Sequence, residues 1–201
     1  EHQFSVGGLR FHYLASADRR APKGRVGIMK PRALVDAYAA LFAQIRPERA
    51  VEFGFRHGGS SIFFAKLGRL KRLVGFDLRS HTPSVLDMVR QHGEDARISL
   101  HFGVPQDDGS AIRAAIGREF EGHPLDLIVD DASHLYAQSR ATFEACFAYL
   151  RPGGAYVIED WGWANWPGAW QTPEAQWRDR PALTNFIFEL VMVAASCPHI
   201  V

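Results

Sequence analysis

Two apolar runs in this chain each end in adjacent carboxylates, and this feature constrains the fold most. The runs are residues 125–131, LDLIVDD, and residues 154–160, GAYVIED. A short apolar run that stops abruptly at polar residues is typical of a strand buried on both faces, as in a parallel sheet. In open α/β sheets, ligands bind just beyond the carboxyl ends of such strands. We therefore expect a ligand site where these two runs end.

Strand-like and helix-like segments alternate along the rest of the chain. Helices are expected over residues 31–45, from the glycine-rich segment 54–61 through 67, and over 83–91, 110–120, about 136–150 and 181–195. Further short strands are expected at 50–53, 73–76 and 97–102. Because this alternation is typical of a parallel sheet, the predicted fold is α/β: a doubly wound, mostly parallel sheet with helices on both faces.

The carboxylates that end the two acidic runs are expected to converge. If the two strands are neighbours, Asp131, Glu159 and Asp160 meet at one point, with His134 one turn further along. Crowded carboxylates repel one another, so either one takes up a proton or a cation lies between them. We interpret the cluster as a divalent metal site with a base beside it. Carboxylates are hard oxygen ligands and no Cys or His cluster offers a zinc set, which favours Mg²⁺ or another hard divalent cation.

Two residues of this segment have a plain structural alternative. His134 could be a residue at the start of a helix whose ring bonds only to the backbone. Its place beside Asp131 and opposite the second acidic pair favours a catalytic base instead. Asp130 is assigned to the cofactor side, but it could also serve only to cap the following helix or to orient a neighbour.

A glycine-rich loop, residues 52–60, EFGFRHGGS, joins the strand at 50–53 to the next helix. Glycines let the backbone approach a ligand, and a helix N-terminus offers free N–H groups. An acid at the end of the following strand typically holds ribose hydroxyls. The spacing fits neither G-x-G-x-x-G nor a P-loop, which favours an adenosine cofactor without a pyrophosphate, such as S-adenosylmethionine. The alternative is that the glycines only make a tight turn. The residues assigned to this cofactor are Glu52, Gly54, Gly58, Ser60 and Asp77.

The glycine loop and the acidic runs together resemble a known family. Residues 51–54 and 58–60 resemble motif I of the class I S-adenosylmethionine-dependent methyltransferases. Residues 126–134, 142–144 and 150–160 are similar to the macrocin and mycinamicin sugar O-methyltransferase subgroup, which has cephalosporin hydroxylase-like relatives. The segment IMKP at 28–31 fits the part ahead of the first strand, so the resemblance covers roughly residues 27–160. It implies a Rossmann-like methyltransferase sheet.

The resemblance also implies roles for individual residues. In that family an aspartate after the fourth strand and an acidic pair after the fifth hold magnesium, and a histidine three places beyond the first aspartate is the base. Asp131, Glu159, Asp160 and His134 occupy these positions here. Such enzymes hold the adenine ring after the third strand, where Gln106 is followed by Asp107 and Asp108. An ordinary polar loop would look the same at that place.

The function that this resemblance implies is metal-dependent O-methylation of a sugar hydroxyl in natural-product biosynthesis. Mg²⁺ would orient the hydroxyl and lower its pKa, and His134 would take the proton. Three alternatives stay open. They are a catechol-type methyltransferase acting on an aromatic diol, a hydroxylase-associated protein, and a non-catalytic protein that keeps the S-adenosylmethionine pocket.

All five tryptophans lie within residues 161–177, just past the second acidic run. Flat aromatic rings beside a metal suit a sugar ring or a bulky aglycone. Two or three of them are expected only to anchor the loop to the domain. Tyr136 and Gln138 are expected near the same opening.

Composition limits the classes of partner. A net charge of +1 gives no indication of nucleic acid or of an anionic membrane, and no apolar stretch is long enough to span a bilayer. Two cysteines make no disulfide framework, which favours a cytoplasmic protein. The partner expected from the resemblance is a small, sugar-containing acceptor, and the chain could also form a homo-oligomer. We expect residues 1–30 to be an N-terminal segment that could act as a lid, and 31–201 to be the methyltransferase domain. Its usual C-terminal hairpin is expected to be absent, with Ile200 and Val201 inside a sixth strand.

Overall fold

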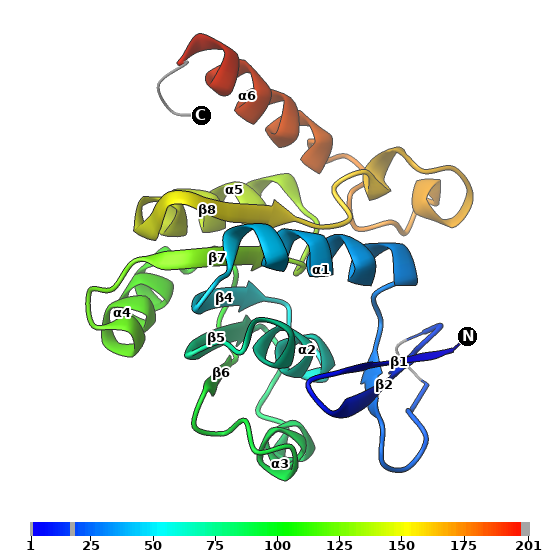
Figure 1. The fold of residues 1–201 in the computed structure, drawn as a ribbon. Helices are drawn as coiled ribbons and strands as arrows, with labels where there is room; N and C mark the ends of the chain where they lie inside the picture. The colour runs from blue at the N-terminus through cyan, green and yellow to red at the C-terminus, as the bar shows by residue number, and fades with distance from the viewer. Residues whose placement is uncertain (1, 17–18, 198–201) are drawn as a thin grey trace.

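A computed structural model describes residues 2–16 and 19–197 and has a five-stranded parallel sheet at its centre (Figure 1). The strand order is β6-β5-β4-β7-β8. The strands are β4 (Arg49–Phe53), β5 (Arg72–Asp77), β6 (Ile98–Phe102), β7 (Leu125–Asp130) and β8 (Leu150–Ile158). The prediction that the two acidic-ended strands are neighbours is therefore confirmed, since β7 and β8 pair in parallel.

Six α-helices and three short 3₁₀ helices surround this sheet in the described residues. The α-helices are α1 (Arg32–Ile45), α2 (Gly59–Gly68), α3 (Pro83–Gln91), α4 (Gly109–Phe120), α5 (Tyr136–Cys146) and α6 (Leu183–Ser196). The 3₁₀ helices are η1 (Phe147–Tyr149), η2 (Trp163–Asn165) and η3 (Gly168–Gln171). No helix in the described ranges has the length and apolar character needed to cross a lipid bilayer.

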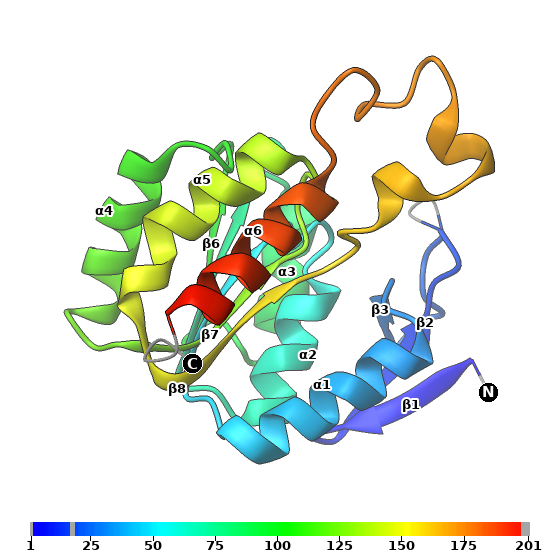
Figure 2. The same cartoon turned by 90° about the horizontal axis from the view of Figure 1, so that it is seen from above.

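The central strands are buried on both faces, and this explains their continuous apolar sequence. Along β4, Ala50 packs with residues of α1, α2 and α3, whereas the next residue, Val51, packs with residues of α4 and α5. Figure 2 shows α4 and α5 on one side of the sheet and α1 and α2 on the other. The predicted doubly wound α/β fold is therefore confirmed.

The N-terminal segment forms a second sheet that the sequence analysis did not predict. Strands β1 (Gln3–Val6), β2 (Leu9–Tyr13) and β3 (Val26–Ile28) lie in the order β1-β2-β3. The rings of Phe4 and Phe11 both pack edge-on against Phe63 of α2, with centroids 5.8 Å away. Because its apolar residues join the core of the main sheet, this segment is packed on the domain.

Helix α6 lies over α5, outside the β8 edge of the sheet (Figure 1). Phe186 anchors it through edge contacts with Tyr136 and Phe143. The last predicted helix is thus present, at Leu183–Ser196. The sixth strand expected at Ile200 and Val201 lies outside the described residues.

Candidate functional site

The tips of four adjacent strands are joined by backbone hydrogen bonds that continue beyond the strands themselves. Gly54 N donates to Phe76 O at 2.8 Å, Asp131 N to Phe53 O at 3.0 Å, and Glu159 N to Asp130 O at 2.9 Å. These bonds fix where the first residue after each strand lies. As a result the glycine loop and both acidic runs meet at the same edge of the sheet.

Gly54 allows the glycine loop and the first acidic run to touch. Its φ is +87°, and a Cβ atom placed on it would lie 2.1 Å from the Asp131 carbonyl oxygen. A side chain at this position would therefore push the two loops apart. A glycine is therefore needed at position 54 because the backbone of the first acidic run approaches it closely, in addition to any ligand that binds there.

A cavity of about 830 Å³ opens over these strand tips and reaches the N-terminal segment. Most of the predicted site residues line it: Gly54, Ser60, Asp77, Gln106, Asp107, Asp131, His134, Glu159 and Asp160. Glu52, Gly58 and Asp130 are not among its lining residues. The cavity is large enough for a nucleoside-sized ligand together with part of a second one.

Asp131, His134 and Asp160 form a tight group at one end of the cavity, and their candidate ligand atoms all lie within 4.8 Å of one another. His134 Nε2 is 4.0 Å from Asp131 Oδ1, which is too far for a direct hydrogen bond. Two carboxylates and an imidazole at this spacing suit a divalent cation that keeps some of its waters. The two carboxylates therefore fit the predicted metal, and His134 lies beside them, where the sequence predicts a base.

The backbone is in the left-handed region at two of these three residues. His134 has φ 57° and Asp160 has φ 53°. Three of the other non-glycine residues with positive φ are helix C-caps, where this conformation is common. His134 and Asp160 cap no helix C-terminus, and each costs the fold conformational energy. Both side chains are thereby turned toward the group formed with Asp131.

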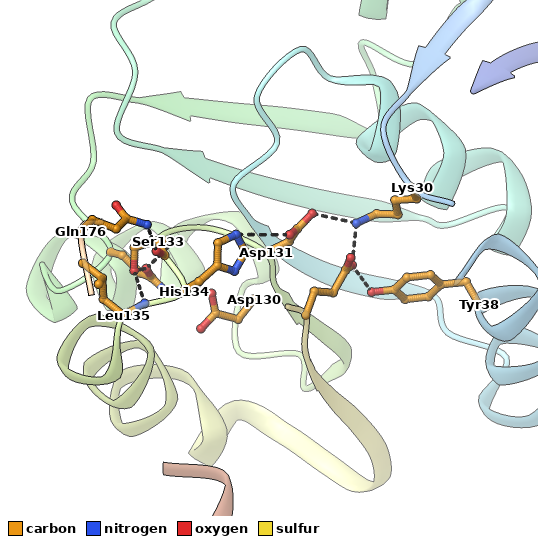
Figure 3. A network of polar contacts seen from close by, with 10 residues as sticks. Lys30, Tyr38, Asp130, Asp131, Ser133, His134, Leu135 and Gln176 are labelled. Atoms are coloured by element: carbon orange, nitrogen blue, oxygen red, sulfur yellow. Dashed lines mark hydrogen bonds and ion pairs between the residues drawn. The ribbon is translucent and has the colours of Figure 1, made fainter. Parts of the chain in front are cut away.

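Lys30 bridges the first and second acidic runs (Figure 3). Its Nζ donates to Asp131 Oδ2 at 2.8 Å and to Glu159 Oε1 at 2.5 Å. Tyr38 of α1 also donates its hydroxyl to Glu159 Oε1, at 2.5 Å. The Lys30 residue is only 4% exposed. The Glu159 carboxylate is therefore held by two buried donors, the Lys30 ammonium and the Tyr38 phenol.

Burial and pairing act in opposite directions on the pKa values of this cluster. Burial by itself would lower the pKa of Lys30, but the neighbouring Asp131 and Glu159 carboxylates outweigh it and hold this pKa above its ordinary value. Burial raises the pKa of Glu159, against the effect of Lys30. Burial likewise raises the pKa of Asp160, against the effect of His134. The Lys30 ammonium therefore keeps its proton to a higher pH than a solvated lysine, because its pKa is raised.

The sequence analysis did not assign Lys30 or Tyr38 to the site. Lys30 lies in the quoted segment IMKP, and a lysine between apolar residues is a weak signal of a buried, paired cation. Tyr38 lies on the buried stripe of α1 with Val35 and Phe42, where a phenol needs a hydrogen-bond partner. Neither signal identifies the partner, because the partners lie more than 90 residues away in the sequence.

Glu52 lies beneath the glycine loop and does not reach the cavity. The residue is 0% exposed, and its Oε2 accepts a hydrogen bond from Ser61 Oγ at 2.5 Å. Burial raises its pKa. Its contact with α2 fixes the start of that helix, where Gly59 and Ser60 line the cavity.

Asp77 reaches the cavity at the end of β5, where the sequence predicts a ribose-binding acid. Its Oδ2 accepts from Arg56 N at 2.7 Å and its Oδ1 from Arg79 N at 2.9 Å. Each carboxylate oxygen has a second lone pair. The carboxylate is thus positioned by the backbone and keeps capacity for two hydroxyl donors.

Gln106, in the loop after β6, links this loop to the first acidic run. Its Nε2 donates to Asp130 Oδ1 at 2.6 Å, and its Oε1 accepts from Ser133 Oγ at 2.6 Å. Burial raises the pKa of Asp130 to about 6. Of the two following acids, Asp108 caps α4 by accepting from Ala111 N, and Asp107 lines the cavity. Asp130 is thus bonded to Gln106 and does not line the cavity, and its role stays a prediction.

Four of the five tryptophans form one cluster, and only Trp163 lines the cavity. Its ring lies 4.3 Å from the His134 ring, centroid to centroid, and 4.4 Å from that of Trp170. Trp177 donates Nε1–H to the Trp170 carbonyl. Gln138 lines the cavity as expected, whereas Tyr136 donates to Glu189 of α6. The cluster thus holds the loop together through contacts among its own rings, and the expectation that two or three tryptophans anchor the loop to the domain stays a prediction.

Comparison with protein families matches residues 51–161 to a family described as "Methyltransferase domain". The matched range contains the glycine loop and both acidic runs. It is more than half of the chain.

Two curated proteins are similar to parts of the chain. Demethylmacrocin O-methyltransferase of Streptomyces fradiae is 40% identical over 81 residues, which are 39% of this chain and 19% of that protein. Mycinamicin VI 2''-O-methyltransferase of Micromonospora griseorubida is 34% identical over 119 residues, 57% of this chain and 27% of that protein. The aligned segments thus span less than a third of these relatives' lengths.

A solved structure shares the fold. It is described as MycE methyltransferase from the mycinamycin biosynthetic pathway in complex with Mg, SAH and mycinamycin VI. The TM-score is 0.59 at 25% identity, and the match covers 82% of this chain and 43% of that one.

Proposed function

The chain belongs to the methyltransferase-domain family, and from this premise we propose that it transfers a methyl group from S-adenosylmethionine to a hydroxyl of a sugar-bearing small molecule. The observation that carries the proposal is the group of Asp131, His134 and Asp160, which borders the same cavity as the glycine loop. A methyl donor and an acceptor hydroxyl bound there would be neighbours. The similarity to two macrolide sugar O-methyltransferases supports a glycosylated acceptor over a plain aromatic diol.

The methyl donor is proposed to lie along the tips of β4, β5 and β6. Gly54 and Ser60 line its amino-acid end, Asp77 accepts from the ribose hydroxyls, and Gln106 and Asp107 border the adenine end. Glu52, Gly58 and Asp130 act from behind the cavity wall by fixing these loops. Strand-tip binding of this kind is general for open α/β sheets.

The metal is proposed to be Mg²⁺, held by Asp131 and Asp160, whereas Glu159, the third ligand expected from the sequence, lies outside this group and is paired with Lys30 and Tyr38. When bound, a divalent cation lowers the pKa of a coordinated hydroxyl and fixes its position. The strained backbone at Asp160 supports a functional role for its orientation. The carboxylates suit magnesium because their oxygens are hard ligands.

His134 is proposed as the general base. Its Nε2 takes the proton of the acceptor hydroxyl, the hydroxyl oxygen bonds to the methyl carbon, and the bond from that carbon to the donor's sulfur breaks. The Trp163 ring lies against the imidazole and limits its rotation. A positioned base contributes about 10²–10⁴-fold to the rate. Holding the two reactants in line supplies much of the remaining acceleration.

The test combines calorimetry with a methyl-transfer assay. S-adenosylmethionine should bind the wild-type chain with or without magnesium, and transfer to a glycosylated macrolide should stop in EDTA. Asp131→Ala should abolish magnesium-dependent transfer and leave donor binding within about threefold, because Asp131 contacts the metal end only. Asp36→Ala, an exposed residue of α1 paired with Arg32, is the matched control and should keep full activity.

Two results would overturn this proposal. Full activity in EDTA would contradict the proposed role of the metal. If the intact wild-type chain does not bind S-adenosylmethionine, the proposed methyltransferase activity is contradicted. Faster transfer to a catechol than to any glycosylated acceptor would show that the acceptor is an aromatic diol rather than a sugar. The proposed methyl transfer to a hydroxyl would stand.

A further inference from the structure

Lys30 is the one described lysine that is almost fully buried at the cavity, and the proposed chemistry gives it no role. It lies between β3 and α1, and its side chain reaches the tips of β7 and β8. Its ammonium also lies 5.7 Å from the ring centroids of Tyr38 and Phe64. These contacts make it a fixed part of the site, because withdrawing the ammonium would leave the buried Glu159 carboxylate without its charged partner.

Asp131 is shared between two places that can hold a positive charge. Its Oδ2 contacts the Lys30 ammonium at 2.8 Å, and its Oδ1 faces His134 Nε2 at 4.0 Å. Figure 3 shows Asp131 between Lys30 on one side and His134 on the other. The first place, formed with Glu159, is already occupied by the ammonium. The second, formed with Asp160 beside His134, is the proposed metal position.

The formal charges show how the Lys30 ammonium changes the affinity of the proposed metal position for a divalent cation. Asp131, Glu159 and Asp160 carry three formal negative charges when ionised, and Lys30 cancels one of them. The remaining two match a divalent cation. Two positive charges that share one carboxylate repel each other, and at a partly buried site the repulsion is only weakly screened. The ammonium must therefore weaken the binding of a metal ion beside it.

We propose that Lys30 is a built-in cation of this site, which holds Asp131 and Glu159 together when no metal is bound and lowers the affinity of the Asp131–Asp160 position for a divalent ion. This inference rests on the metal site of the proposed function. Its consequence is a site that is preformed without metal and exchanges metal readily. By linkage, metal binding in turn weakens the ion pair between Lys30 and Asp131.

The experiment measures Mn²⁺ binding and thermal unfolding of the chain without methyl donor, with Lys30→Met as the main variant. Free Mn²⁺ is followed by electron paramagnetic resonance at one fixed pH. Lys30→Met should bind Mn²⁺ at least about tenfold more tightly than the wild type. In EDTA its melting temperature should be lower by about 6–15 °C, since a buried carboxylate has lost its partner, and saturating Mn²⁺ should recover more of this loss than it adds to the wild type.

Two further variants control for packing and folding. Tyr38→Phe removes the other donor to Glu159 Oε1 without changing charge, so its Mn²⁺ affinity should stay within about threefold of the wild type. Lys30→Gln keeps a donor of similar length and removes the charge. It should shift Mn²⁺ affinity in the same direction as Lys30→Met, and it serves if the methionine variant does not fold.

The possible results separate this inference from the proposed function. Tighter Mn²⁺ binding by the neutral variants supports the built-in cation. Equal or weaker binding by folded neutral variants, with a wild type that binds Mn²⁺, overturns the inference and leaves the metal site standing. Failure of both wild type and variants to bind Mn²⁺ overturns both the inference and the metal part of the proposed function, whereas donor binding by calorimetry is unaffected.

Discussion

The two ends of the cavity hold their buried carboxylates in different ways. At the glycine-loop end, Glu52 is bonded to Ser61, nine residues away, and Asp77 to the N–H groups of Arg56 and Arg79. At the metal end, Asp131 and Glu159 share Lys30, which is 101 and 129 residues away in the sequence. The carboxylates at the glycine-loop end are therefore positioned by groups close to them in the sequence. Those at the metal end are positioned only when the N-terminal segment, which carries Lys30, packs on the domain.

The difference separates what each end contributes to the proposed reaction. Asp77 is fixed by two backbone N–H groups and keeps lone pairs for a ligand, so this end forms a rigid receptor, which suits binding of the methyl donor. Carboxylates that depend on a distant cation keep unused lone pairs toward the cavity, which suits a metal and a base. Substitutions at the metal end should therefore act on turnover, and those at the glycine-loop end on donor affinity.

The largest effect is expected for His134→Ala. Removing the base should lower kcat by about 10²–10⁴-fold, with donor affinity unchanged within about threefold. Steady-state kinetics with a glycosylated acceptor, together with calorimetry of S-adenosylmethionine, measures both quantities. His123→Ala, an exposed histidine between α4 and β7, is the control and should behave as wild type. A parallel loss of donor binding would show that the two ends do not act separately.

Between the two ends lies Asp130, and its titration should appear in the stability of the fold. Burial raises its pKa from the ordinary 3.8 to about 6. Between these values the folded chain binds more protons than the unfolded one, so the wild type loses stability as pH rises from about 4 to about 6. Asn cannot ionise, and the free energy of unfolding of Asp130→Asn should gain roughly 3 kcal/mol on the wild type over that range.

Urea unfolding in EDTA at several pH values between 4 and 7 measures this difference. Below the ordinary pKa of an aspartic acid both proteins carry a neutral side chain, and their stabilities should be similar. The same substitution at Asp87, an exposed residue of α3 paired with Arg90, should leave the wild-type curve unchanged. Parallel curves for Asp130→Asn and the wild type would mean that Asp130 stays ionised in the folded chain.

The sequence predicted the central sheet and the convergence at the metal end because both follow from local pattern. Apolar runs that end in acids define buried parallel strands, and neighbouring strands bring Asp131 and Asp160 together. The three-stranded N-terminal sheet was missed because β1, β2 and β3 have only 4, 5 and 3 residues, too few for a clear alternation.

Roles that depend on long-range packing were also beyond sequence reasoning. Whether a lysine such as Lys30 is solvated or buried depends on where its segment docks, and nothing near it in the sequence specifies that. The same holds for Glu52, which the sequence assigned to the cofactor. Its place after a strand was evident, but the side of the loop on which its carboxylate lies depends on the packing of α2.

The smallest effect, and the sharpest contrast with His134→Ala, is expected for Asp77→Asn. The amide keeps one acceptor oxygen but loses the charge that strengthens hydrogen bonds to ribose hydroxyls, and its NH₂ group faces one of the two backbone N–H groups that position Asp77. The expected change is about 1.5 kcal/mol or more, at least roughly tenfold in affinity. Calorimetry should therefore show weaker binding of S-adenosylmethionine, while kcat at saturating donor stays within about twofold. Asp87→Asn again serves as the matched control. Unchanged donor affinity with a reduced kcat would place Asp77 with the metal end and remove the division between the two ends of the cavity.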